Sequence, residues 1–366
     1  MAELIVDRNY FAGSDRTVAK WLLAVAALVF CMIVVGGATR LTDSGLSITE
    51  WKPIVGAIPP LGETAWEAAF EKYKEIPEYH RVNKGMSLED FKFIFWWEWA
   101  HRFLGRFIGL AFAVPLVMFW YRGALRSDMT PKLAGILVLG GLQGAIGWYM
   151  VSSGLVDRVD VSQYRLALHL GVAFLILGSL VWLALDHLPL HRHVEQVSVS
   201  TRQRMLANAL TAGVFLQVLL GALVAGLKAG LAYNTWPDMN GALVPAGLGE
   251  MTPWYLNLFE NVTAVQFNHR LMAYAVLILA LANAWSLSRH TAGALRSSAM
   301  LVAGAVFAQA ALGIWTLLAA VPLPLGLIHQ GGAAIVFALV VRHLFLIDRA
   351  VGPEPVQASA EPREAA

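Results

Sequence analysis

The sequence predicts an all-α integral membrane protein whose eight transmembrane helices form two pseudo-symmetric four-helix bundles. Composition is the first observation behind this prediction: 57% of the 366 residues are hydrophobic and 14% are charged, which is far more apolar than a soluble domain of this size needs. The second is a series of eight long apolar runs. The third is a motif that recurs in the two halves of the chain.

Each apolar run has about the 20 residues that a helix needs to cross a bilayer. The runs cover residues 21–38, 100–121, 133–151, 164–185, 206–227, 267–287, 298–320 and 325–347. The first is too long for the apolar part of a signal peptide and more spans follow it, so we expect it to stay as an uncleaved anchor. Polar residues inside later runs are tolerated where helices bury them against one another.

The charge of the short loops predicts the orientation. One set of connections, at 121–132, 186–205 and 288–297, carries Arg122, Arg126, Lys132, Arg192, Arg202, Arg204, Arg289 and Arg296. The opposite set, at 152–163, 228–266 and 321–324, carries only Arg158 and Lys228. Because short cytoplasmic loops hold the excess of positive charge, the first set is predicted to be cytoplasmic and both termini to lie inside. The formal charge of +2 gives no indication of a nucleic-acid partner.

These spans predict a simple domain organisation. It consists of a cytoplasmic segment 1–20, an N-terminal four-helix bundle 21–186 with an outer loop 39–99, a cytoplasmic linker 187–205, a C-terminal four-helix bundle 206–348 and a cytoplasmic tail 349–366 without regular structure. Within the outer loop, residues 39–60 are rich in Gly, Pro, Ser and Trp and predict irregular structure. Residues 63–92 are charged, with aromatic residues at helical spacing, and predict one or two short amphipathic helices.

The two halves share a motif at corresponding places. His101-Arg102-Phe103-Leu104 opens the second span and His269-Arg270-Leu271-Met272 opens the sixth. Leu168-His169 and Ile328-His329 lie early in the fourth and eighth spans, and Gln143 with Gly147 in the third matches Gln309 with Gly313 in the seventh. Spans four positions apart run in the same direction, so the repeat is parallel, about an axis along the membrane normal.

Four histidines therefore share one depth near the outer face: His101, His169, His269 and His329. An imidazole at this depth needs a partner, and two facing histidines of a helical bundle can provide the axial ligands of a heme iron. For any one of them, a hydrogen bond to a neighbouring helix is the alternative, but four symmetric positions favour heme, with up to one site in each bundle. Zinc or copper would need carboxylate or thiolate companions in both bundles, and the second bundle supplies none nearby.

Charged residues beside the histidines are further candidates. Glu98 lies three residues before His101 and hence on the same helix face. A carboxylate there can move protons or stabilise positive charge during oxidation of a C–H bond; the alternative is a carboxylate at a helix N-terminus, favoured by the helix dipole. Guanidinium groups at the outer ends of spans either pair with heme propionates or extend to the membrane interface. They are Arg40, Arg102, Arg106 and Arg270.

Several motifs resemble those of one known family. They are Gly36-Gly37-Ala38-Thr39-Arg40-Leu41-Thr42-Asp43-Ser44-Gly45-Leu46-Ser47-Ile48-Thr49-Glu50-Trp51-Lys52-Pro53 with Gly56 and Ile58-Pro59-Pro60, then Glu98-Trp99-Ala100-His101-Arg102, Tyr233-Asn234-Thr235-Trp236-Pro237 and Phe267-Asn268-His269-Arg270. Together they resemble the heme A synthases of the branch without an outer-loop cysteine pair, since the single cysteine, Cys31, lies in the first span.

This resemblance implies an enzyme of cytochrome oxidase assembly in the bacterial inner membrane. Its substrate would be heme O, of which one methyl group is oxidised twice, through an alcohol, to the formyl group of heme A. The resemblance also implies that His269 and His329 ligate a resident heme b, the cofactor. His101, His169 and Glu98 would form the substrate side, with the first two on the iron of the substrate heme.

The expected partners follow from the same resemblance. They are heme O synthase, cytochrome oxidase assembly factors and an electron-transfer partner, and the family also allows a homo-oligomer. Two other functions use the same four histidines: a di-heme b cytochrome that only transfers electrons, and a heme carrier without catalysis. Neither gives a reason for a carboxylate beside a ligand.

Overall fold

The computed structural model describes residues 2–156, 158–188 and 197–350. Within these ranges eight helices are long and apolar enough to cross a membrane, as the sequence predicts. They are α1 (Ala2–Leu41), α4 (Leu88–Tyr121), α5 (Thr130–Val151), α6 (Gln163–Asp186), α7 (Thr201–Gly226), α8 (Val262–His290), α9 (Gly293–Leu318) and α10 (Leu323–Arg349). In α1 the candidate span is Asp15–Leu41. The predicted tail lies almost entirely outside the described residues.

The helices extend beyond the apolar runs that predicted them, because polar caps set where they begin. α4 begins at Leu88 instead of residue 100: Ser87 caps it, with its hydroxyl accepting from the Asp90 amide at 3.1 Å and the Asp90 carboxylate accepting in return. Ser200 and Gln203 form the same capping box at the start of α7. Glu98 therefore lies inside α4, and the expected outer loop 39–99 ends before that helix.

The segment between α1 and α4 contains two short helices, where one or two amphipathic helices were expected. They are α2 (Glu63–Lys74) and α3 (Pro77–Arg81), and a single 3-10 turn, η1 (Val55–Ala57), precedes them. Phe70 and Tyr73 of α2 are buried against Phe91, in the first turns of α4. The early start of α4 thus gives the outer segment an apolar surface on which to fold.

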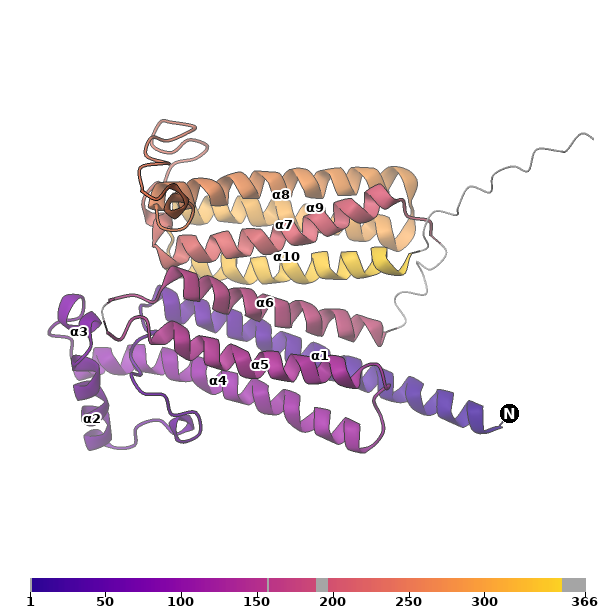
Figure 1. Ribbon diagram of the computed structural model, residues 1–366, viewed down its shortest axis with the longest axis horizontal. Coiled ribbons are helices and arrows are strands. Elements are labelled where there is room, and N and C mark those ends of the chain that lie inside the picture. The colour runs from indigo at the N-terminus through magenta and orange to yellow at the C-terminus, as the bar shows by residue number, and fades with distance from the viewer. Residues whose placement is uncertain (1, 157, 189–196, 351–366) are drawn as a thin grey trace, which may run out of the picture.

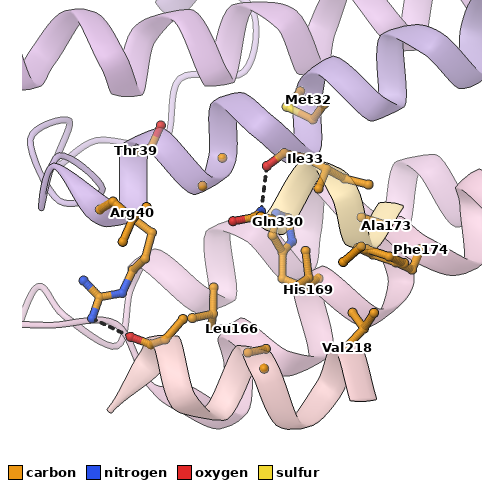
Figure 2. A pocket seen from close by; sticks show the side chains of 18 of the residues that line it. Met32, Ile33, Thr39, Arg40, Leu166, His169, Ala173, Phe174, Val218 and Gln330 are labelled. Atoms are coloured by element: carbon orange, nitrogen blue, oxygen red, sulfur yellow. Dashed lines mark hydrogen bonds between the residues drawn. The ribbon is translucent and has the colours of Figure 1, made fainter. Parts of the chain in front are cut away.

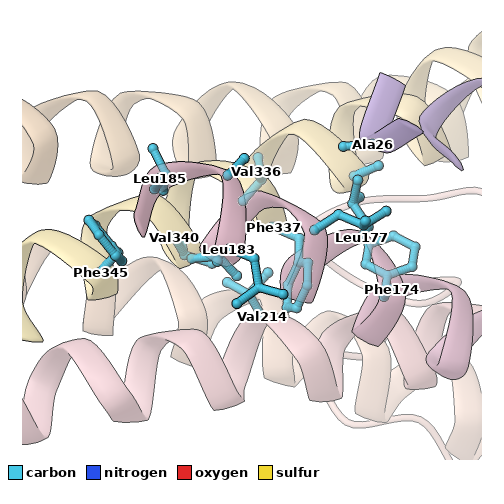
Figure 3. Packing of buried hydrophobic residues seen from close by; sticks show 14 of the residues in the cluster. Ala26, Phe174, Leu177, Leu183, Leu185, Val214, Val336, Phe337, Val340 and Phe345 are labelled. Atoms are coloured by element: carbon cyan, nitrogen blue, oxygen red, sulfur yellow. The ribbon is translucent and has the colours of Figure 1, made fainter. Parts of the chain in front are cut away.

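The eight long helices form two groups side by side (Figure 1), an arrangement that fits the expected two bundles. One contains α1, α4, α5 and α6, the other α7 to α10, and they meet where α1 and α6 pack against α10 and α6 against α7. Figure 3 shows this interface, where Phe174 and Leu177 of α6 face Phe337 and Val340 of α10 and Val214 of α7. Close packing of this kind holds helices together in lipid.

At the end of the molecule away from α2 and α3, ionic contacts join the long helices. The Asp186 carboxylate, at the end of α6, accepts from Arg126 at 2.6 Å and also from Arg349 of α10. His187 contacts Asp15 of α1 at 2.6 Å. These contacts hold that end of the helix groups together.

Candidate functional site

One large cavity of about 1440 Å³ reaches into both helix groups. Its wall includes His101, His169, His269 and His329, so the four histidines that the repeat singled out do face one space. Pockets for a single small ligand usually measure about 300–1,000 Å³. The cavity is therefore large enough for more than one sizeable ligand.

The first histidine pair is separated by a gap suited to a metal. The ring centres of His101 and His169 lie 6.5 Å apart, which leaves room for two imidazole–metal bonds of about 2 Å once the ring radii are added. A Cβ on Gly36 would lie 3.1 Å from His101 Nε2, and one on Gly147 would lie 3.0 Å from His169 Cε1. Glycine is therefore what lets α1 and α5 approach the two rings.

The second pair is backed by glycines in the same way. A Cβ on Gly221 of α7 would lie 3.2 Å from His269 Cε1, and one on Gly313 of α9 would lie 2.8 Å from His329 Cε1. Among the described residues, no group of three or more His, Cys, Asp or Glu side chains could hold a bare metal ion. Two histidines per site do suit a heme, because the porphyrin supplies the other four ligands.

Glutamines orient the histidines from neighbouring helices. Gln143 Nε2 donates to the His169 carbonyl oxygen at 2.9 Å, and Gln309 Nε2 donates to that of His329 at 2.7 Å. This contact explains the matched Gln and Gly pairs that the sequence showed in the third and seventh spans.

A third glutamine was missed by the sequence reasoning, although it has the same spacing to a glycine. Gln217 stands four residues before Gly221 on α7, and its Nε2 donates to the His269 carbonyl oxygen at 3.1 Å. The same nitrogen is within 3.3 Å of both ring nitrogens of His269. The corresponding place on α1, four residues before Gly36, is occupied by Met32, which also lines the cavity.

Glu98 lines the cavity and is 2% exposed. Its Oε2 accepts hydrogen bonds from Ser47 Oγ at 2.8 Å and from the Ile48 amide at 2.7 Å, while its Oε1 accepts from Arg102 at 2.6 Å. Arg102 also donates to the carbonyl oxygens of Ile48 and Glu50. Because α4 starts ten residues earlier, the alternative of a carboxylate at a helix N-terminus is wrong for Glu98.

The second half has an equivalent arginine contact, but its neutral residue donates to the neighbouring segment where Glu98 accepts. Gln266 lies three residues before His269, and its Nε2 donates to the carbonyl oxygens of Ala229 at 2.9 Å and Tyr233 at 3.2 Å. Its Oε1 accepts from Arg270, which also donates to three backbone carbonyls of residues 233–238. In both halves an arginine and the residue four before it hydrogen-bond to the segment that connects the first two long helices of that half.

The arginines expected to bind propionates all line the cavity, and each holds protein groups. Arg40 forms ion pairs with Asp43 at 2.8 Å and Asp160 at 3.3 Å, and reaches across to the carbonyl oxygens of Ala225 and Gly226 on α7 (Figure 2). Its Nε has no hydrogen-bond partner among the described residues, nor does Nε of Arg270 or Nη1 of Arg106. Each keeps a donor for a ligand, and propionate binding stays a prediction.

The halves differ in the space between two of their helices. The α4–α5 side of the cavity is lined by four glycines that have nothing within 4 Å of an added Cβ: Gly109, Gly140, Gly141 and Gly144. When the histidine and glutamine motifs are superimposed, the second half has Leu277, Val306, Phe307 and Ala310 at these places. The first half thus has glycines where the second has larger apolar side chains.

Comparison with known proteins gives extensive matches. Residues 19–341, which include all four histidines, match the family model of the cytochrome oxidase assembly protein. A heme A synthase of Parvibaculum lavamentivorans is 54% identical over 332 residues, covering 91% of this chain and 94% of the relative. Those of Chelativorans sp. and Bradyrhizobium diazoefficiens are 54% identical over 324 residues (88% and 89% covered) and 51% identical over 330 residues (89% and 90% covered).

Proposed function

The chain belongs to the heme A synthase family of cytochrome oxidase assembly proteins, and from this premise we propose that its first half holds heme O while its second half holds a resident heme b. As a heme A synthase, it converts a methyl group of heme O to the formyl group of heme A. The observation that carries the assignment of the halves is their difference around equivalent histidine pairs. Among the described residues, only the first has a carboxylate beside the pair and an open glycine-lined side.

The second half suits a group that stays bound. Gln217 contacts the backbone carbonyl oxygen and the ring of His269, and Gln309 contacts those of His329. Contacts of this kind orient a ligand histidine and strengthen its binding. Leu277 and Phe307 occupy the side that is open in the first half. A heme bound here would supply one-electron redox chemistry, while the protein fixes the two imidazoles and excludes water.

The first half suits a group that must arrive and leave. His101 and His169 would hold the iron of heme O, and the glycine side between α4 and α5 leaves room for exchange. Nδ1 of His169 has no partner among the described residues, in contrast to the second half, where Gln309 lies 3.1 Å from Nδ1 of His329. A less restrained ring is consistent with a site that binds its ligand reversibly.

Glu98 is the proposed catalytic carboxylate. Arg102, Ser47 and the Ile48 amide fix its two oxygens beside His101, so it needs no rearrangement to act on a substrate in the cavity. A carboxylate oxygen has more than one lone pair, and among the described residues Oε1 accepts a hydrogen bond only from Arg102. Glu98 would accept a proton, or stabilise the positive charge that develops, as the methyl carbon is oxidised.

The test of this function is the heme content of membranes. Cells that make heme O are analysed by chromatography of extracted hemes with and without the protein. Heme A should appear only with the protein, through two successive oxidations with an alcohol in between. A di-heme b cytochrome or a heme carrier would leave heme O unchanged, and that result would exclude the enzyme.

The basic loops predict an orientation in which the histidine ends of the helices lie outside. Figure 1 shows α2 and α3 at the same end as the segment between α7 and α8. Reporter fusions after residues 127 and 292 should therefore report the cytoplasm, and fusions after residues 75 and 245 the outside. A cytoplasmic signal from residue 75 would contradict this orientation. Heme O synthase and oxidase assembly factors remain the predicted partners.

A further inference from the structure

Glu78, on the outer helix α3, has no part in the function proposed above. It is 3% exposed and lines the same cavity as the four histidines. Its Oε2 is buried and has no hydrogen-bond partner among the described residues. A buried polar group without a partner is destabilising, so its presence needs a reason.

The other carboxylates at this end of the cavity all have cations beside them. Arg40 Nη1 lies 2.8 Å from Asp43 and 3.3 Å from Asp160. Lys228 Nζ lies 3.2 Å from Asp43 and 3.4 Å from Asp160. Two acids and two bases therefore form a closed network that joins the ends of α1 and α7 to the segment before α6.

Glu98 is paired as well, with Arg102 at 2.6 Å. Three carboxylates are thus matched by three cations, and Glu78 is a fourth carboxyl group, buried beside them. A carboxylate removed from water without a cation binds a proton more tightly. Glu78 is therefore the acid of this group whose charge is not fixed by an ion pair.

Burial raises the pKa of Glu78 to about 8, and the negative charges nearby act in the same direction. The charged groups that face it are Asp43, Glu98, Asp160 and Lys228, of which only Lys228 lowers its pKa. Tyr73 of α2 faces it too, and burial together with the charge of Glu78 raises the pKa of that phenol, which stays neutral. Near neutral pH Glu78 is thus mostly protonated, with the ionised form within reach.

We propose that Glu78 exchanges protons between the cavity and the water on the outer face. In each exchange the carboxyl O–H bond breaks toward a water molecule on one side and forms again with a proton from a water molecule on the other, and no electron moves. The inference rests on the proposed function, because a methyl group that becomes a formyl group loses two hydrogens inside the cavity. Glu78 suits this exchange because α3 lies on the outer surface, and His80, two residues later, is exposed.

The test compares Glu78→Gln with Glu78→Asp and with Glu75→Gln, a control at an exposed site in the same segment. In the full-length protein, Glu78→Gln should keep its bound heme but convert heme O to heme A roughly tenfold more slowly. Glu78→Asp should restore part of the rate, and Glu75→Gln should behave as the parent. The rate of the parent should also change with pH through the titration of Glu78, and that component should vanish in Glu78→Gln.

A second readout does not depend on turnover. Infrared difference spectra of the purified protein between roughly pH 6 and pH 9 should show a carboxylic acid band that disappears as the pH rises, in the parent but not in Glu78→Gln. If the band is absent from the parent, or if Glu78→Gln has the parent's rate and pH profile, the proposal is wrong. A parent that shows the band but makes no heme A would instead contradict the proposed function.

Discussion

Glu98 in the first half and Gln266 in the second stand three residues before a histidine, and each is joined to the arginine four residues later. Both pairs fasten an outer loop by hydrogen bonds to its backbone. A neutral amide is sufficient for this purpose in the second half. The loop of the first half presents donors, the Ser47 hydroxyl and the Ile48 amide, and needs the acceptor that Glu98 provides, whereas the loop of the second half presents carbonyl oxygens. The comparison therefore teaches that each residue matches the loop it holds, and that among the described residues only the first half has a carboxylate at this place.

The two halves also differ in the size of the side chains on the helix faces beside the histidines. Gly140 and Gly141 have free space beside them in the first half, whereas the larger Val306 and Phe307 stand at the equivalent places in the second. The two halves thus keep equivalent histidine pairs and differ in what surrounds them. Under the proposed function, the second half would hold a heme and the first would admit one and act on it.

The largest expected effect is the loss of a ligand histidine. His269→Ala or His329→Ala should abolish binding of the resident heme b, and activity with it, because the axial bonds are lost and a polar cavity is left in the bundle. His101→Ala and His169→Ala should keep the heme b and lose heme A production. The measurement is the low-spin b-type spectrum of each purified variant, and an unchanged spectrum for either second-half variant would reverse the assignment.

Glu98→Gln should have the next largest effect, by making the first half resemble the second. We expect heme b to be retained and heme A to be nearly absent, with heme O or the alcohol accumulating, because the loss falls on the transition state. The Ile48 amide would lose its acceptor, so stability should also fall by about 1–3 kcal/mol. A normal heme A fraction in hemes extracted from the variant would leave Glu98 with a structural role only.

Gly141→Phe tests the open side by introducing the residue that the second half has there. Nothing lies within 4 Å of a Cβ at Gly141, so the helix should tolerate the ring, which would fill the space between α4 and α5. Binding of heme O should weaken by roughly tenfold, while the heme b spectrum stays unchanged. Gly135→Phe is the control, because this glycine is on the same helix with equally free space and is not part of the cavity wall. Equal effects of the two changes would contradict the role of the opening.

Much of this arrangement could be predicted from the sequence, because apolar length and a repeated motif are local signals. The eight spans came from such signals, and so did the choice of the four histidines, which the structure then places around one cavity. The contacts of Glu98 could not, since Ser47 and Ile48 are about fifty residues away in the chain. Glu78 was hidden for a related reason: it belongs to a charged segment that appears solvent-exposed, and only its packing beside the cavity buries it.

The smallest expected effect concerns the glutamines, and it tests whether each half acts on its own ligand. Gln309→Leu keeps the size of the side chain and removes the donor to the His329 carbonyl, at 2.7 Å, and the contact with its ring. The carbonyl belongs to a helix and keeps other hydrogen bonds, so the cost to stability should be about 1 kcal/mol. The orientation of His329 should suffer more, with heme b affinity falling roughly tenfold and its reduction potential shifting. Gln143→Leu is the matched change in the first half, where the donor contacts the His169 carbonyl at 2.9 Å. It should leave the spectrum and potential of heme b unaltered and weaken only the binding of heme O.

If Gln143→Leu changed the heme b spectrum as much as Gln309→Leu does, the resident heme would not belong to the second half alone, and the division of roles between the halves would fail.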